Sequence, residues 1–528
     1  MNKHGLFAFS LILTWSIVLV SCNREPEIVR PNILFCIADD ASFPHMGAYG
    51  CDWVKTPSFD RIAEQGILFT NAYTPNAKCS PSRSCILTGR NTWQLEEACN
   101  HVPFFPEKFK VYTEALAEHG YYTGMTGKGW APGEPGTRNG KPRHLAGIPF
   151  KEIKLKPPTS GIAAVDYSRN FGEFLKTVPE GEPWCFWYGG HEPHRAYEYG
   201  SGVALGGKET ADIDQVPDFW PDTDIARNDI LDYAYEIEYF DKHLGGILKQ
   251  LEIEGLLENT LIVVTADNGM PFPRIKGQEY ELSNHLPLAI MWKDGIKSPG
   301  RIVNDMVSFI DFAPTFIEVA GLDWEETGMA SSPGRSLYGI FKSGNESRAE
   351  HRNHIVIGKE RHDVGRPDDQ GYPIRGIVRD GYLYLRNFEP SRWPVGNPET
   401  GYLNTDGSPT KTQILEMRRQ DKNSEYWEMN FGKRPDEELY QISEDPYCMN
   451  NLADDEAYEK LKQQMRDLLF LELQTQEDPR ILGQGHIFDE YVYADTATRD
   501  FYNRFMAGET MKAGWVEKSD FEPQPIRE

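Results

Sequence analysis

The chain has 528 residues, with 55 basic and 80 acidic side chains and a formal net charge of −25 at pH 7. So acidic a protein is a poor candidate for general nucleic-acid binding or for adhesion to anionic membranes, although a locally basic pocket for an anionic substrate is compatible with it. With 39% hydrophobic and 12% aromatic residues, the composition is that of a globular protein with a large core.

The N-terminus has the pattern of an export signal. An apolar run over residues 6–20 is short for a membrane span, and it ends in Leu-Val-Ser-Cys, which is similar to a bacterial lipobox. We therefore expect a signal peptide over residues 1–22, with Cys22 acylated after cleavage, and a polar tether over residues 23–30. The mature protein is then an exported bacterial lipoprotein, periplasmic or at the cell surface, that meets the membrane through its lipid anchor only.

Strands and helices alternate through the first part of the chain. Apolar segments predict strands over residues 32–38, 67–73, 183–188 and 260–265, and helical patterns occur over residues 56–66, 112–119 and 230–254. Such alternation predicts an α/β domain with a predominantly parallel sheet. We place this domain at residues 31–345.

The rest of the chain has a different pattern. Residues 331–347 are rich in loop-forming residues, and a shorter strand region follows over residues 376–385. A late amphipathic helix is expected over residues 457–473. These features predict a smaller C-terminal α+β domain over residues 346–528, packed on the first.

Polar side chains follow two of the predicted buried strands, those over residues 32–38 and 260–265. Because ligands gather beyond the carboxyl ends of strands in open α/β sheets, these side chains are candidates for a metal site. A capping aspartate would account for one of the two adjacent carboxylates, but less comfortably for both. The set offers only oxygen donors, which suit Ca²⁺ or Mg²⁺ better than zinc: Asp39, Asp40, Asp267 and Asn268.

The segment over residues 79–90 reads Cys-Ser-Pro-Ser-Arg-Ser-Cys-Ile-Leu-Thr-Gly-Arg. An ordinary helix start would explain Pro81, but not Arg83 or the Leu-Thr-Gly-Arg ending. The segment resembles the signature of type I sulfatases, and matching motifs cover most of the chain beyond the tether. The resemblance implies an alkaline-phosphatase-like α/β fold with a smaller C-terminal α+β domain, and release of sulfate from a sulfated saccharide.

The resemblance also implies a set of site residues. Cys79 would be oxidised to formylglycine by a maturation enzyme, and its hydrated aldehyde would carry the nucleophile. One divalent cation, Ca²⁺ before Mg²⁺, would be held by Asp39, Asp40, Asp267, Asn268 and the modified Cys79. Arg83 would hold the aldehyde hydrate, and the sulfate would be contacted by Lys128, His191 and Lys276. The leaving atom would be protonated by His191 or Lys276.

One position departs from the family pattern. The family usually reads Lys-x-His where this chain reads Lys128-Gly129-Trp130. In the family that histidine is a candidate base for the step that eliminates sulfate from the enzyme. Because an indole cannot accept a proton, the base in this chain must be another residue, with His101 and His144 as candidates. We expect Trp130 to stack on the sugar instead. The other expected sugar contacts are His194, Arg195, Arg361 and His362, of which the last two could equally belong to a solvated surface loop.

Two stretches, residues 191–195 and 267–273, look most similar to sulfamidases, the family members that act on N-sulfated glucosamine of heparan-type glycans. The expected substrate is therefore a sulfate ester or sulfamate of a saccharide. Three alternatives stay open. They are an O-sulfatase acting on another polysaccharide, a formylglycine-dependent phosphonate or phosphate ester hydrolase, and a non-catalytic lipoprotein that binds sulfated glycans.

Overall fold

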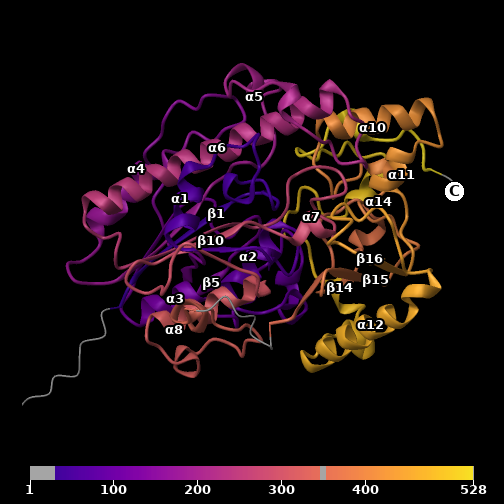
Figure 1. Cartoon of the computed structure of the whole chain (residues 1–528). Helices are drawn as coiled ribbons and strands as arrows, with labels where there is room; N and C mark the ends of the chain where they lie inside the picture. The colour runs from indigo at the N-terminus through magenta and orange to yellow at the C-terminus, as the bar shows by residue number, and fades with distance from the viewer. Residues whose placement is uncertain (1–29, 345–351, 527–528) are drawn as a thin grey trace, which may run out of the picture.

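The computed structural model describes residues 30–344 and 352–526. The expected signal peptide and nearly all of the expected tether lie outside these residues. Figure 1 shows most of the first two thirds of the chain, coloured indigo through magenta to salmon, on one side of the molecule, and the last third, orange to yellow, on the other. In the described part of the chain, no helix combines the length and apolar character needed to span a membrane.

The main sheet has eight strands in the order β11-β2-β10-β9-β1-β8-β4-β7. The strands from β9 to β7 run parallel, while β10 pairs antiparallel with both of its neighbours and β11 pairs parallel with β2. The strand bounds are β1 Asn32–Ala38, β2 Ile67–Phe69, β4 Tyr122–Gly127, β7 Ile148–Pro149, β8 Trp184–Gly189, β9 Thr260–Ala266, β10 Leu288–Met291 and β11 Arg301–Val303.

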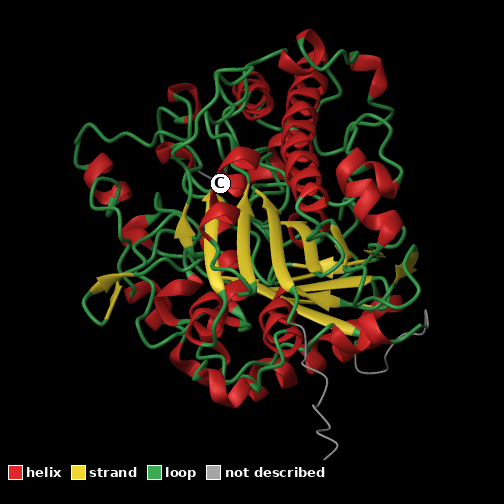
Figure 2. Cartoon of the chain, turned by 90° about the vertical axis from the view of Figure 1, so that its left-hand side faces the viewer, coloured by secondary structure: helices red, strands yellow, loops and turns green. Residues whose placement is uncertain are grey.

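Helices cover both faces of this sheet, as Figure 2 shows. Alternate side chains of β1 enter different cores: Leu34 packs with the helices on one face, and Phe35 with those on the other. The first face is covered by α1 (Pro57–Gln65), α4 (Tyr167–Thr177) and α6 (Asp224–Ile253). The second is covered by α2 (Cys79–Thr88), α3 (Tyr112–Glu118) and α8 (Phe312–Val319). Burial on both faces explains why β1 and β9 are mostly apolar.

The last third contains a four-stranded antiparallel sheet in the order β13-β14-β15-β16. The strand region expected over residues 376–385 is a hairpin of β14 and β15. Helix α12 packs on this sheet through Leu469 and Leu473. The bounds are β13 His354–Lys359, β14 Ile374–Arg379, β15 Tyr382–Asn387, β16 Glu437–Tyr440 and α12 Glu459–Thr475.

The C-terminal part also extends the first core. Ile414 of α10 (Pro409–Gln420) and Phe431 of α11 (Glu425–Phe431) are buried in the same cluster as α6. The predicted fold class is confirmed, with a mostly parallel central sheet between helices and a C-terminal antiparallel sheet. Helix α6 begins earlier than expected, because the Thr223 side chain caps it by accepting a hydrogen bond from the backbone N–H of Ala226.

Candidate active site

The polar residues after β1 and β9 meet at one edge of the sheet. Ala38 and Ala266 are aligned in neighbouring parallel strands, so the residues that follow them emerge side by side. The backbone N–H of Asp40 donates to Asp267 Oδ1 at 3.0 Å and ties the two strand ends together. Cys79 is the first residue of α2 and reaches the same place from the other side of the strand ends.

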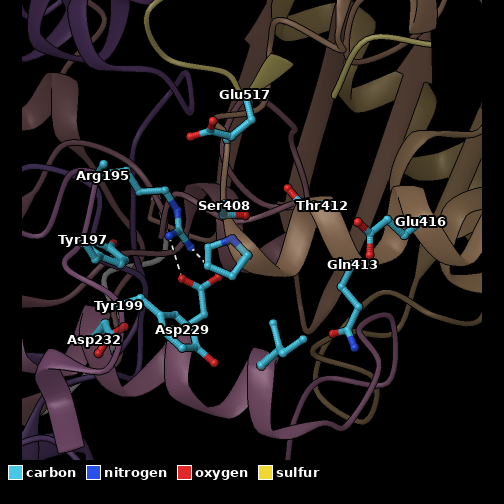
Figure 3. Close-up of a pocket in the computed structure, with 14 residues that line it drawn as sticks. Arg195, Tyr197, Tyr199, Asp229, Asp232, Ser408, Thr412, Gln413, Glu416 and Glu517 are labelled. Atoms are coloured by element: carbon cyan, nitrogen blue, oxygen red, sulfur yellow. Dashed lines mark hydrogen bonds and ion pairs between the residues drawn. The ribbon is translucent and has the colours of Figure 1, made fainter. Parts of the chain in front are cut away.

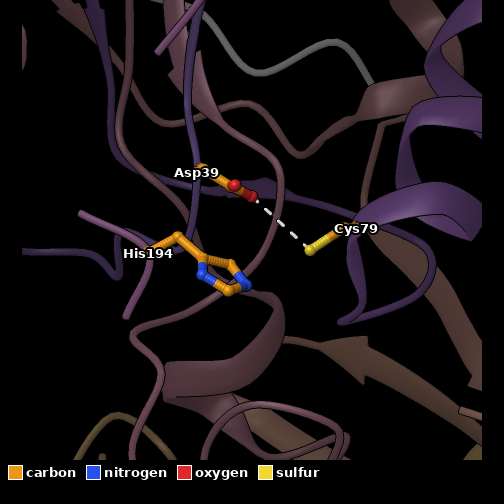
Figure 4. Close-up of side chains that lie close together, drawn as sticks. All are labelled: Asp39, Cys79 and His194. Atoms are coloured by element: carbon orange, nitrogen blue, oxygen red, sulfur yellow. Dashed lines mark hydrogen bonds between the residues drawn. The ribbon is translucent and has the colours of Figure 1, made fainter. Parts of the chain in front are cut away.

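Three buried carboxylates form the centre of this site. Asp39, Asp40 and Asp267 each offer an oxygen atom within 4.8 Å of the others. Cys79 Sγ lies 3.5 Å from Asp39 Oδ1 and 3.8 Å from Asp40 Oδ1, and Figure 4 shows Cys79 pointing toward Asp39, with His194 beside them. Among the described residues, the buried Oδ1 of Asn268 has no hydrogen-bond partner. This all-oxygen donor set, with an unpaired amide oxygen, fits a hard divalent cation.

Cations surround the carboxylates. Lys128 Nζ lies 2.6 Å from Asp39, Arg83 Nε donates to Asp267 at 2.8 Å, and Lys276 Nζ lies 2.6 Å from Asp40. Burial alone would raise the pKa of Asp39, but Lys128 and the other nearby cations hold it well below its usual range. At Asp267 burial prevails over Arg83, and the pKa rises to about 7. The site therefore has positive groups placed to receive an anion beside a cluster that suits a metal ion.

A cavity of about 680 Å³ opens above these groups. Its floor includes Asp39, Cys79, Lys128 and Lys276, and His191 stands at the end of β8 with its side chain exposed toward it. The C-terminal part supplies a portion of the wall. The wall residues from that part are Asp363, Asp406, Tyr493, Asp495 and Trp515.

Sequence reasoning missed several of these residues. Asp406 Oδ2 lies 2.7 Å from Lys276 Nζ, so that Lys276 bridges Asp406 and Asp40. Trp515 donates its indole N–H to the backbone carbonyl of Leu403 at 2.8 Å, which fixes its ring in the cavity wall. Both lie in loops without periodicity or motif. Lys78 was detectable in principle, because it directly precedes Cys79.

Three expected sugar contacts lie elsewhere. Trp130 is only 8% exposed, packs edge-on against Phe105, and donates its indole N–H to Ser84 Oγ at 2.8 Å. It does not line the cavity, so the structure does not place this ring where stacking on the sugar was expected. Arg361 and His362 are also fully buried and absent from the wall, and neither forms a solvated loop. His362 is held by Asn76 Oδ1 at 2.8 Å.

Two expected contacts do reach the cavity. His194 Nε2 lies 3.9 Å from Asp40 Oδ2. Arg195 lines this cavity and a second one of about 580 Å³ next to it, where its guanidinium forms a bidentate pair with Asp229 at 2.6 and 2.9 Å (Figure 3). Because Asp229 already neutralises this charge, Arg195 adds little positive potential for an anion.

Residues 31–322 match the family model described as Sulfatase. The chain belongs to the sulfatase family. Its members hydrolyse sulfuric esters, and the cluster of acidic side chains agrees with the family's use of a metal ion and formylglycine.

Sulfatases that act on glycans are among the relatives of this sulfatase. It is 24% identical over 512 residues to the N-sulphoglucosamine sulphohydrolase of Homo sapiens, covering 90% of this chain and 95% of the relative. It is 25% identical over 524 residues to an ulvan-active sulfatase of Formosa agariphila, covering 88% of this chain and 80% of the relative.

The fold of the sulfatase also resembles solved structures. One is a protein in complex with its substrate D-glucosamine-2-N,6-O-disulfate, with a TM-score of 0.61 and 20% identity, covering 85% of this chain and 98% of the other. At this identity the likeness establishes the fold alone.

Proposed function

We propose that this sulfatase releases sulfate from a saccharide, with N-sulfated glucosamine of heparan-type glycans as the preferred substrate. The observation that carries the proposal is the cavity itself: its floor joins Cys79, the carboxylate cluster and two lysines, and its wall offers carboxylates and aromatic rings suited to a sugar. The similarity to the human N-sulphoglucosamine sulphohydrolase over 90% of the chain favours a sulfamate over an ester.

In this proposal Cys79 is converted to formylglycine, whose hydrated aldehyde supplies the attacking hydroxyl. A Ca²⁺ ion held by Asp39, Asp40, Asp267 and Asn268 would supply positive charge next to the sulfate oxygens when bound. The Sγ atom of Cys79 marks where an oxygen of the modified side chain would lie.

The basic side chains of the site would stabilise negative charge, position a loop and donate a proton. Lys128 and Lys276 offset the negative charge of the sulfate as the bond to sulfur breaks. Arg83 Nη1 donates to the backbone carbonyls of Lys128 and Gly129 at 2.9 and 2.8 Å, which fixes the loop that carries Lys128. His191 or Lys276 would give a proton to the departing nitrogen or oxygen, because both line the cavity.

A desulfation screen tests the proposal. Purified enzyme is incubated with glucosamine N-sulfate, glucosamine 6-sulfate and an aryl phosphonate, and the released sulfate or phosphonate is quantified. We expect the highest kcat/KM for the N-sulfate. The Lys128→Ala variant should show no measurable turnover. Peptide mass spectrometry on the same sample should find the aldehyde at Cys79 and an unmodified thiol at Cys85.

The other outcomes each favour a different function. Turnover of only the 6-sulfate would make the protein an O-sulfatase, and faster cleavage of the phosphonate would make it a phosphonate hydrolase. Glycan binding without turnover, with an unmodified Cys79, would favour a non-catalytic lipoprotein. Export and acylation at Cys22 belong to the same proposal, and Cys22→Ala should release the protein from the membrane fraction of its bacterial host.

A further inference from the structure

His101 lies in the wall of the active-site cavity, in a loop that follows the short helix at Glu96–Cys99. Its backbone N–H donates to the carbonyl of Arg361 at 3.0 Å, so the loop is tied to the C-terminal part. The imidazole is only 9% exposed. It shares the cavity with Cys79 and Lys276.

A carboxylate fixes the orientation of this ring. His101 Nδ1 lies 2.8 Å from Asp363 Oδ1, and the other oxygen of Asp363 lies 2.9 Å from Lys78 Nζ. Burial would raise the pKa of Asp363, but Lys78 and His101 hold it at about 2, so this carboxylate stays ionised. An ionised carboxylate only accepts hydrogen bonds, so Nδ1 must carry the hydrogen.

The other ring nitrogen, Nε2, is left unpaired in the part of the chain that the structure describes. Among the described residues, the buried Nε2 of His101 has no hydrogen-bond partner. Burial lowers the pKa of His101, which favours the neutral ring, and with the hydrogen on Nδ1 the free Nε2 is an acceptor. A buried acceptor left unpaired is costly and needs an explanation. The residue that carries it lines the cavity proposed to take the substrate.

We propose that His101 is a substrate-contacting residue whose Nε2 accepts a hydrogen bond from a hydroxyl or an N–H of the bound saccharide, with Asp363 as its positioning residue. This inference rests on the proposed action on a saccharide. Sulfate oxygens cannot donate a hydrogen bond, so the contact recognises the sugar and not the sulfate. His101 therefore contributes to the choice of substrate.

The test compares three variants on glucosamine N-sulfate and glucosamine 6-sulfate. His101→Ala should raise KM about tenfold with kcat nearly unchanged, because one hydrogen bond to the sugar is lost. His101→Gln should recover much of the loss, since its amide oxygen can replace Nε2 as an acceptor. His144→Ala is the matched control: His144 is exposed and lies outside the cavity, and KM should stay at the wild-type value.

A second arm addresses Asp363. Asp363→Asn should raise KM in the same direction, and combining it with His101→Ala should add little, because both act on one contact. Melting temperatures separate this effect from misfolding. An unchanged KM in a folded His101→Ala variant of an active enzyme would overturn the inference alone, as would a fall in kcat at constant KM. A wild-type enzyme inactive on both sugars would reject the proposed function and this contact with it.

Discussion

In the candidate active site, each buried carboxylate is paired with a side chain of opposite charge. The carboxylates of Asp39 and Asp40 each have a lysine within 2.6 Å, and Arg83 pairs with Asp267. Buried charges are tolerated only when they are paired, and removing one partner leaves the other uncompensated. The same logic explains Asp406, whose carboxylate gives Lys276 a second partner. Substitutions here therefore disturb two groups at once.

The two tryptophans near the site give a prediction at this scale. Trp130 and Trp515 each donate one indole hydrogen bond, but only Trp515 lines the cavity. Trp130→Phe should lower the free energy of unfolding by about 1–3 kcal/mol, through the lost hydrogen bond and a small void, and leave KM unchanged. Trp515→Phe should raise KM for glucosamine N-sulfate. Urea unfolding and steady-state kinetics check both, and a raised KM in Trp130→Phe would restore the stacking hypothesis.

At the scale of elements, the site depends on the close backbone approach between the carboxyl ends of β4 and β8. Gly127 of β4 faces Gly189 of β8, and the backbone N–H of Lys128 donates to the Gly189 carbonyl at 2.8 Å. A Cβ atom on Gly127 would lie 1.9 Å from that carbonyl oxygen, and its φ of +74° is one that side chains disfavour. The two glycines thus let the segments that carry Lys128 and His191 leave neighbouring strands close together, and both residues line the cavity.

Gly127→Ala should therefore damage both stability and activity. Gly140 is the matched control, because its φ of +73° carries the same strain but a Cβ there meets nothing within 4 Å. We expect Gly140→Ala to cost about 1 kcal/mol, and Gly127→Ala several times more, with a clear fall in kcat. Urea unfolding and kinetics on both variants measure this. Equal losses in the two would show that the close approach of β4 and β8 is unimportant.

The elements that carry a repeating pattern could be predicted from the sequence. β1 and β9 are mostly apolar because both faces are covered, and the polar residues that follow them are adjacent because the strands are parallel. The cavity wall carries no such pattern. In the loop after β13, Arg361 and His362 are buried away from the cavity while Asp363 lines it, and an irregular loop has no periodicity that would tell these side chains apart. An assignment off by one residue therefore selects the wrong side chain.

On the scale of the whole molecule, the candidate metal site joins segments that are far apart in the sequence. The carboxylates follow β1 and β9, and Cys79 begins α2. The unfolded chain has no such site, so a bound ion stabilises only the folded state, by about 2.7 kcal/mol at a concentration of 100 Kd. Metal binding should therefore be visible as thermal stability.

Ca²⁺ added at about 100 Kd to protein freed of metal with a chelator should raise the melting temperature by about 2 °C. Asp267→Ala should abolish this shift, because it removes one of the three clustered carboxylates. Asp222→Ala is the control: Asp222 is exposed and pairs only with Arg227 at the surface, so the shift should persist. Scanning calorimetry measures all three proteins. A shift produced by zinc and not by Ca²⁺ or Mg²⁺ would contradict the oxygen-donor assignment.

The cavity is divided between the two parts of the chain in a way that bears on evolution. The groups that would handle sulfate come from residues 39–276, whereas Asp363, Asp406 and Trp515 of the wall come from the last third. Point changes in that third at positions such as Trp515, which does not pair with a sulfate-handling group as Asp406 pairs with Lys276, can alter which sugar fits without touching the groups that handle sulfate. Duplicated genes for this chain can therefore acquire new glycan specificities by drift in their 3′ portion alone, while the encoded chemistry is inherited intact.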